Sequence, residues 1–256
     1  MTKDILLFDG ERLDKVNEDL WLIQKKNGLT FGTDALLLAA FMPKTPSKIA
    51  LDFGAGTGII SMLCAERDKF RKIYAVEAQQ KFTDLIERNA GINQLFDRIT
   101  AVCCDVRALT PQTIGAEADV VFSNPPYMRT ASGKLNSSGI KTLARHEILG
   151  GISDFCAAAS KNLKFGGRFY AVYRPQRLGE LTYAMQSAGI APKRLCLVFP
   201  DASAAPSLLL IEGKKGAAEG IRVTPPLLMY TAKDHKDYTD AFAHIYQNGD
   251  FPDEFR

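Results

Sequence analysis

The sequence has few cysteines, no long apolar run and little excess of charge, and each of these absences excludes a class of protein. Its five cysteines include no C-x-x-C pair, so we expect neither a disulfide framework nor a metal site, but buried and reduced thiols. The longest apolar run, residues 35–42, is far shorter than the roughly 20 residues that a membrane-spanning helix needs. The first residues resemble no secretory signal, which indicates a cytoplasmic protein.

The composition predicts one ordinary globular unit. The chain has 256 residues, of which 46% are hydrophobic and 24% charged, and this is average usage with ample material for a core. Lys and Arg number 32 against 29 Asp and Glu, so the net charge of +3 is low for a nucleic-acid-binding protein. Nothing in this pattern indicates a membrane or an obligate protein partner.

Apolar runs bounded by Gly, Pro or Asp alternate with segments of helical period, which is typical of an α/β fold around a parallel sheet. After the helix expected at residues 178–188, two strand runs follow without a long helix between them, which favours an antiparallel hairpin at the sheet edge. The expected strands are residues 49–53, 72–76, 99–104, 120–122, 168–173, 194–199 and 207–212, and the expected helices are 58–66, 80–91, 153–163 and 178–188.

Both ends of the chain depart from this alternation. We expect residues 1–45 to form an amino-terminal flap, with an extended run at 20–23 and a helix over 34–41 that Thr33 caps. Residues 46–256 would form the main domain. Residues 238–255 predict a polar-faced helix followed by a fraying end.

A glycine-rich turn follows the first strand of the main domain. Gly54, Gly56 and Gly58 let the backbone turn tightly and let a ligand approach closely, but their G-x-G-x-G spacing does not match the G-x-G-x-x-G of NAD sites. Asp52 at the strand end would hold a cationic amino group and would sit poorly beside a pyrophosphate. This favours S-adenosylmethionine over NAD as the cofactor.

Two further acidic residues follow the next strands. Glu77 is placed to accept hydrogen bonds from both ribose hydroxyls of a nucleoside, and Asp105 could bind the adenine amino group. Each of them could equally cap an exposed strand end. Three acids at three successive strand ends favour the cofactor interpretation.

The motif Asn124-Pro125-Pro126-Tyr127 follows the fourth strand, where ligands bind in open α/β sheets. A planar amino nitrogen attacks a sulfonium methyl group only when acceptors polarise its N–H groups. The Asn124 side-chain oxygen and the Pro125 carbonyl could supply these acceptors, and Tyr127 offers a face on which a base or a planar amide stacks. The motif therefore predicts methyl transfer to an exocyclic or amide nitrogen.

These segments resemble class I S-adenosylmethionine-dependent methyltransferases, and within them the bacterial tRNA adenine-N6 methyltransferases that modify the adenosine beside the anticodon of valine tRNA. The resemblance covers nearly the whole chain and rests on residues 31–39, 52–58, 124–127, 144–147 and 192–194. It implies a Rossmann-like fold whose mostly parallel sheet has seven strands. It also implies that Thr33 and Asp34 fold over the methionine end of the cofactor.

Basic residues around the motif indicate contact with RNA. Arg129 and Lys134 lie in a Gly- and Ser-rich loop that could meet phosphates, and Arg145 and His146 follow it. For the last two, the pattern slightly favours a helix-start ion pair with a half-buried histidine over an RNA contact.

Other functions stay open on the sequence. A protein glutamine methyltransferase of the release-factor type also uses Asn-Pro-Pro-Tyr, but it carries a longer helical region ahead of the glycine turn. A DNA adenine methyltransferase would need an added recognition region. A non-catalytic RNA-binding module and a dehydrogenase are the remaining alternatives.

Overall fold

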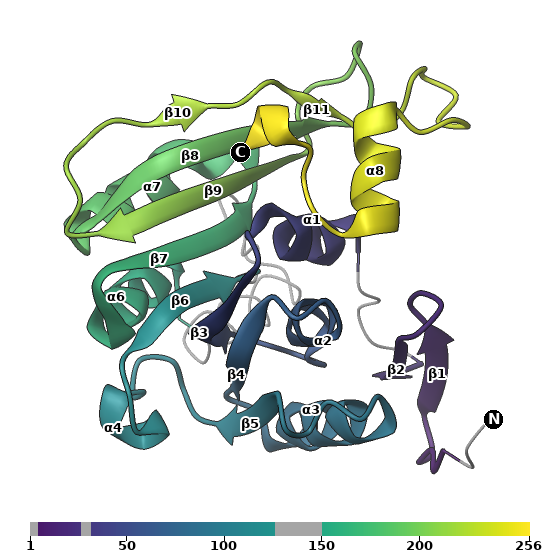
Figure 1. Ribbon diagram of the computed structural model, residues 1–256, viewed down its shortest axis with the longest axis vertical. Coiled ribbons are helices and arrows are strands. Elements are labelled where there is room, and N and C mark those ends of the chain that lie inside the picture. Colours follow the sequence, from purple (N-terminus) through teal and green to yellow (C-terminus); the bar gives the residue numbers. More distant parts are fainter. Residues whose placement is uncertain (1–4, 27–31, 126–149) are drawn as a thin grey trace, which may run out of the picture.

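The protein is built around a nine-stranded, mostly parallel sheet with the strand order β10-β8-β9-β7-β6-β3-β4-β5, and β11 pairs with β8 beside β10 (Figure 1). The computed structural model describes residues 5–26, 32–125 and 150–256. Seven strands form the body of the sheet, and two-residue strands extend one edge. The strands are β3 (Thr45–Phe53), β4 (Phe70–Glu77), β5 (Ile99–Cys103), β6 (Ala118–Ser123), β7 (Leu163–Tyr173), β8 (Ile190–Phe199), β9 (Leu208–Lys215), β10 (Arg222–Val223) and β11 (Leu227–Leu228).

This sheet confirms the expected fold class, and the predicted strands all form. Strand β9 runs antiparallel to both β7 and β8, so the expected edge hairpin is present. Two predictions need correction: β10 and β11 add two short parallel strands beyond the seven, and β5 ends at Cys103, so that Asp105 lies in the following turn.

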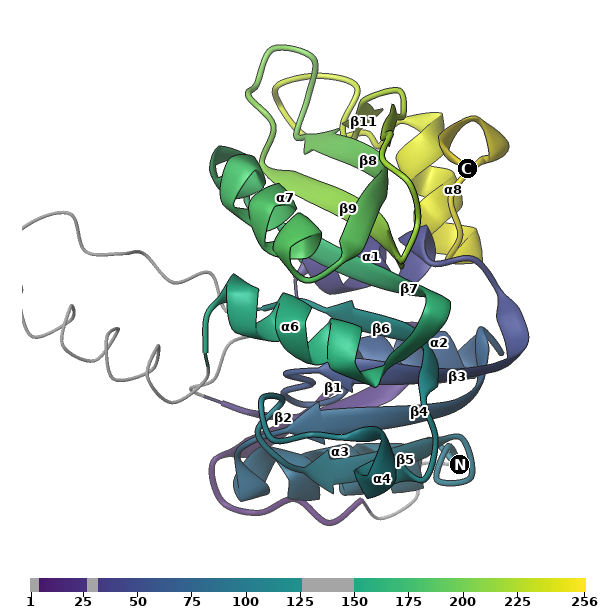
Figure 2. The ribbon, with the colours of Figure 1, turned by 90° about the vertical axis from the view of Figure 1, so that its left-hand side faces the viewer.

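Helices cover both faces of the sheet (Figure 2). One face packs against α1 (Thr33–Phe41), α2 (Ile59–Glu66), α3 (Gln80–Ile92) and α8 (Asp240–Asn248). The other packs against α6 (Ile152–Asn162) and α7 (Leu178–Ser187), with the short α4 (Pro111–Ile114) beside them. None of the helices described in these ranges has the length and apolar character needed to cross a membrane.

The amino-terminal segment attaches to the sheet domain through an antiparallel pair, β1 (Glu11–Lys15) and β2 (Trp21–Lys25). Asn89 of α3 is fully buried and accepts a hydrogen bond from the Ile23 amide while donating to the Ile23 carbonyl and the Thr57 carbonyl. Asn93, one turn later, bonds both backbone groups of Trp21 in the same way. The side-chain amides of Asn89 and Asn93 thus pair with backbone groups of β2, as a neighbouring strand would. The division of the chain at residue 45 stays a prediction.

The predicted fraying carboxyl end is wrong, because the last residues pack into the core. Helix α8 begins at Asp240, and the 3₁₀ turn at Asp253–Phe255 after it buries Phe251 and Phe255 against Phe41 and its neighbours. The buried Arg194 guanidinium donates to the carbonyl oxygen of Phe255. A specific hydrogen bond and apolar burial therefore hold the end in place.

Two smaller expectations also fail. Thr33 is already the first helical residue of α1, so its hydroxyl does not cap the helix; Gly32 holds the cap position without a side-chain bond. Cys64, Cys156 and Cys196 are buried as expected, whereas Cys104 is half-buried and Cys103, the last residue of the edge strand β5, is exposed.

Candidate active site

The register of the sheet brings the ends of four strands together. Phe53 pairs with Ser123 of β6 on one side and with Val76 of β4 on the other, and Glu77 pairs with Cys103 of β5. The residues that follow these strands therefore share one edge, at the point where the chain order of the strands reverses. In open α/β sheets this is the position where ligands bind.

The glycine-rich turn has the backbone that the sequence predicts. Gly54, Gly56 and Gly58 have φ angles of +70°, +57° and +83°, in the left-handed region. A β-carbon on Gly58 would lie 3.2 Å from side-chain atoms of Met62 and Ile86, so this position needs glycine for space as well as for conformation. The turn leads directly into α2.

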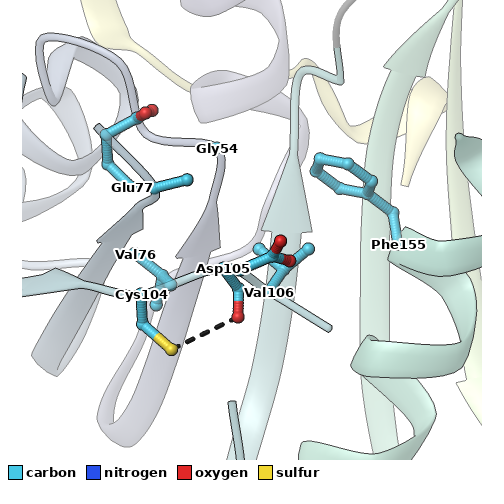
Figure 3. Close-up of a pocket in the computed structure, with 8 residues that line it drawn as sticks. Gly54, Val76, Glu77, Cys104, Asp105, Val106 and Phe155 are labelled. Atoms are coloured by element: carbon cyan, nitrogen blue, oxygen red, sulfur yellow. Dashed lines mark hydrogen bonds between the residues drawn. The ribbon is translucent and has the colours of Figure 1, made fainter. Parts of the chain in front are cut away.

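A hollow opens beside this turn, between the ends of β4 and β5 and the start of α6 (Figure 3). Glu77 lies on one side and the Phe155 ring faces it from the other. The Glu77 carboxylate accepts hydrogen bonds from the Gly56 and Gln79 amides at 3.1 and 3.0 Å, which fixes it against the turn. The lining residues are Gly54, Val76, Glu77, Ala78, Cys104, Asp105, Val106 and Phe155.

Asp105 lines the hollow and forms an ion pair with Arg107. Its carboxylate accepts a hydrogen bond from Arg107 Nε that both oxygens share at 3.0 Å, another of 2.5 Å from Arg107 Nη2, and one from the Arg107 backbone amide. The hydrogen bond from this guanidinium lowers the pKa of Asp105 below its usual value. The residue therefore presents an ionised acceptor at the rim.

Asp52 lies beneath the turn rather than in the hollow. Its carboxylate is 1% exposed, and it accepts one hydrogen bond of 2.7 Å from the Ser61 hydroxyl at Oδ2. Its Oδ1 is buried and has no partner among the described residues. Burial raises the pKa of Asp52 to about 7, and the nearby charge of Glu77 adds to the rise. An acceptor in this state fits a cationic group brought by a ligand.

Asn124 and Asp34 meet at the end of β6. The Asn124 Nδ2 donates a hydrogen bond of 2.9 Å to Asp34 Oδ2, although the two residues are 90 positions apart. Asp34 Oδ1 accepts from the Ala35 amide at 2.9 Å and so helps to begin α1. Pro125 is buried next to Asn124, and Thr33 is exposed.

The other predicted site residues, Pro126, Tyr127, Arg129, Lys134, Arg145 and His146, lie outside the described residues. Sequence reasoning missed three contributors. Phe155 and Val106 follow no motif and reach the hollow only through the packing of α6 and the turn after β5. The sequence offered one signal for Asn89. This residue occupies a position of α3 where the helical repeat places apolar residues, and a polar side chain buried there needs hydrogen-bond partners.

Comparison with known proteins assigns the family. Residues 25–184 match the Methyltransferase small domain family. A tRNA1(Val) (adenine(37)-N6)-methyltransferase of Bacteroides fragilis (strain YCH46) is 30% identical over 186 residues, which make up 73% of this chain and 77% of that protein. The chain belongs to the tRNA1(Val) (adenine(37)-N6)-methyltransferase family.

Other relatives agree with this assignment. A methyltransferase of the same name from Tolumonas auensis is 28% identical over 198 residues, covering 77% of this chain and 81% of that protein. Another, from Shewanella halifaxensis, is 32% identical over 119 residues, and this match spans about half of each protein, at 46% and 47%. Membership of the family makes S-adenosylmethionine the methyl donor of this methyltransferase.

Solved structures support the fold. A predicted O-methyltransferase from Agrobacterium tumefaciens superposes with a TM-score of 0.67 at 23% identity, covering 84% of this chain and 96% of that one. TYW2 of M. jannaschii in complex with AdoMet superposes with a TM-score of 0.54 at 14% identity, covering 83% and 88%. At these identities the likeness shows a shared methyltransferase fold.

Proposed function

We propose that the methyltransferase transfers a methyl group to the exocyclic N6 of an adenosine in tRNA, and that the target is the anticodon-adjacent adenosine 37 of tRNA1(Val). The family relatives carry this activity in their names. The observation that carries the proposal is the placement of Asn124 and Pro125 at the end of β6, one strand from the glycine turn. Such a tRNA enzyme would act in the cytoplasm.

The residues around the turn fit S-adenosylmethionine. The unpartnered Asp52 Oδ1 would take the ammonium group of the cofactor, since a buried carboxylate gains most from an opposite charge. Glu77 keeps lone pairs for the ribose hydroxyls, because each oxygen has accepted one backbone hydrogen bond. Asp105 would accept from the adenine amino group, and Phe155 and Val106 supply apolar surface for its ring.

The remaining predicted cofactor contacts belong to the same turn and to the start of α1. Close approach of the cofactor to the backbone is possible at Gly54 and Gly56. A β-carbon on Gly54 would have its nearest neighbour, the Phe155 ring, at 3.5 Å, and a β-carbon on Gly56 would have no neighbour within 4 Å. Gly58 ends the turn. Thr33 is an exposed residue at the start of α1 and would face the methionine end of the cofactor.

The reaction asks little of the protein beyond alignment and polarisation. S-adenosylmethionine supplies a methyl group on a positively charged sulfur. Asn124 Oδ1 and the Pro125 carbonyl would accept the two hydrogens of the target amine, which holds its nitrogen toward the methyl group and raises its electron density. No strong base is needed, because the amine loses its proton to solvent after the transfer.

The RNA contacts that complete the proposal lie outside the described residues. Pro126 and Tyr127 would bind the target base, with Tyr127 stacking on it after the nucleotide is flipped out. Arg129, Lys134, Arg145 and His146 would contact the RNA backbone.

Methyl transfer from labelled S-adenosylmethionine to unmodified small RNA tests this proposal, run beside a protein extract. We expect N6-methyladenosine in hydrolysed RNA. Asn124→Ala should abolish turnover and leave binding of S-adenosylhomocysteine intact, whereas Asn248→Ala, at an exposed position of α8, should leave both unchanged. Label found only in protein, released as methylglutamine, would replace the RNA substrate by a protein amide.

A further inference from the structure

The contact between Asp34 and Asn124 decides which way the Asn124 amide faces. The two ends of an asparagine amide have nearly the same shape, so packing alone selects poorly between them. An ionised carboxylate, however, has no hydrogen to donate and can only accept. At 2.9 Å, Asp34 Oδ2 therefore requires the Nδ2 end of Asn124 and repels the oxygen end.

We infer that Asp34 is a positioning residue for methyl transfer, which fixes the Asn124 amide with its oxygen turned away from the carboxylate and toward the target amine. This inference rests on the proposed function of Asn124. It differs from the role that the family resemblance implies for Asp34, which is contact with the cofactor. The two roles predict different kinetic effects of the same substitution.

The surroundings of Asp34 hold its carboxylate in place. Oδ1 accepts from the Ala35 amide at 2.9 Å, and this bond directs Oδ2 to Asn124. A β-carbon on Gly32 would lie 2.7 Å from Oδ1. The glycine therefore leaves the space that the carboxylate occupies, and its replacement by alanine would push Asp34 aside.

Asp34→Asn should invert this arrangement. The Ala35 amide needs an acceptor, so the oxygen of the new side chain stays beside Ala35 and its amino group faces Asn124. Asn124 then turns its oxygen toward position 34 and presents its own amino group to the substrate, where it is a donor instead of an acceptor. We expect kcat on the tRNA substrate to fall about 10- to 100-fold, the loss typical of one charge-assisted hydrogen bond.

Four measurements on purified enzyme test the inference. The dissociation constant for S-adenosylhomocysteine should change less than about twofold in Asp34→Asn, because the cofactor contacts stay. Gly32→Ala should also lower kcat without removing any charge. The exposed Asp9→Asn should keep normal kcat. The double variant Asp34→Asn/Asn124→Asp, which exchanges donor and acceptor, should regain at least tenfold in kcat over Asn124→Asp alone.

Unchanged kcat in Asp34→Asn would overturn the inference. Loss of cofactor affinity with normal kcat at saturation would overturn it in favour of cofactor binding. If the unaltered enzyme methylates no tRNA, the proposed function fails. The coupling between Asp34 and Asn124 is then tested by the unfolding free energies of the single and double variants. Non-additive changes in these free energies would support the coupling, and additive changes would refute it.

Discussion

Replacing Asp52 by asparagine should stabilise the cofactor-free methyltransferase while weakening its binding of cofactor. In the structure the Asp52 carboxyl group is 1% exposed, accepts a hydrogen bond from the Ser61 hydroxyl and leaves Oδ1 without a partner among the described residues. Its negative charge is therefore costly until a cation binds. Asparagine keeps the shape and the acceptor for Ser61 but removes the charge.

The magnitude follows from the pKa of Asp52, which burial raises from 3.8 to about 7. The folded protein thus holds the proton more tightly than the unfolded chain, so the free energy of unfolding falls as the pH rises from about 4 to about 7. Above pH 7 the loss is complete and amounts to about 4 kcal/mol. Asp52→Asn should recover part of this, about 2 to 4 kcal/mol at pH 8, because its own amino group is also short of a partner.

Thermal unfolding at pH 5 and pH 8 measures the effect. At pH 8 we expect the melting temperature of Asp52→Asn to lie roughly 5 to 15 °C above that of the unaltered protein, and at pH 5 the gap should shrink. Asp201→Asn is the matched control with the opposite sign. Hydrogen bonds from the Ser203 side chain and from His235 hold the pKa of Asp201 at about 2, so that its loss should destabilise the protein.

Calorimetric titration with S-adenosylhomocysteine completes the test. Asp52→Asn should bind it more weakly at pH 8, and its affinity should lose the decline below pH 7 that protonation of Asp52 causes in the unaltered enzyme. A variant less stable than the parent at pH 8 would refute the reasoning about burial. Equal affinity of Asp52→Asn and the unaltered enzyme at pH 8 would refute the contact between Asp52 and the ammonium group.

Three further substitutions test the framework of the site. Gly58→Ala should lower the free energy of unfolding by about 1 to 2 kcal/mol more than Gly56→Ala, because both glycines have positive φ but only Gly58 is crowded by side chains; equal losses in urea unfolding would contradict this. Asn89→Leu should cost about 3 kcal/mol or more by leaving buried backbone groups unpaired, and a loss below about 1 kcal/mol would mean that water replaces the amide. Arg194→Leu should remove the hydrogen bond to the Phe255 carbonyl and leave Glu212 with Arg168 as its ion-pair partner, so carboxypeptidase should trim the carboxyl end faster; unchanged trimming would show that apolar packing alone holds the end.

Local sequence patterns determined much of this protein. The alternation of apolar runs and helical periods predicts the strands and helices of the sheet domain, because burial of one face is a local property of each element. The glycine turn and the Asn-Pro-Pro-Tyr motif indicate the cofactor and the chemistry, since each needs residues that are adjacent in the chain. The family assignment agrees with that reading.

Contacts between distant residues were decided by the tertiary structure alone. The bond from Asn124 to Asp34 and the clamp of Asn89 on Ile23 join residues far apart in sequence, and no local pattern encodes which groups a fold brings within 3 Å. The raised pKa of Asp52 depends on complete desolvation by neighbours from several elements. The sequence by itself therefore determined which chemistry is possible, and the tertiary structure decided which groups are paired, buried and oriented, because burial and hydrogen bonding are properties of the packed molecule.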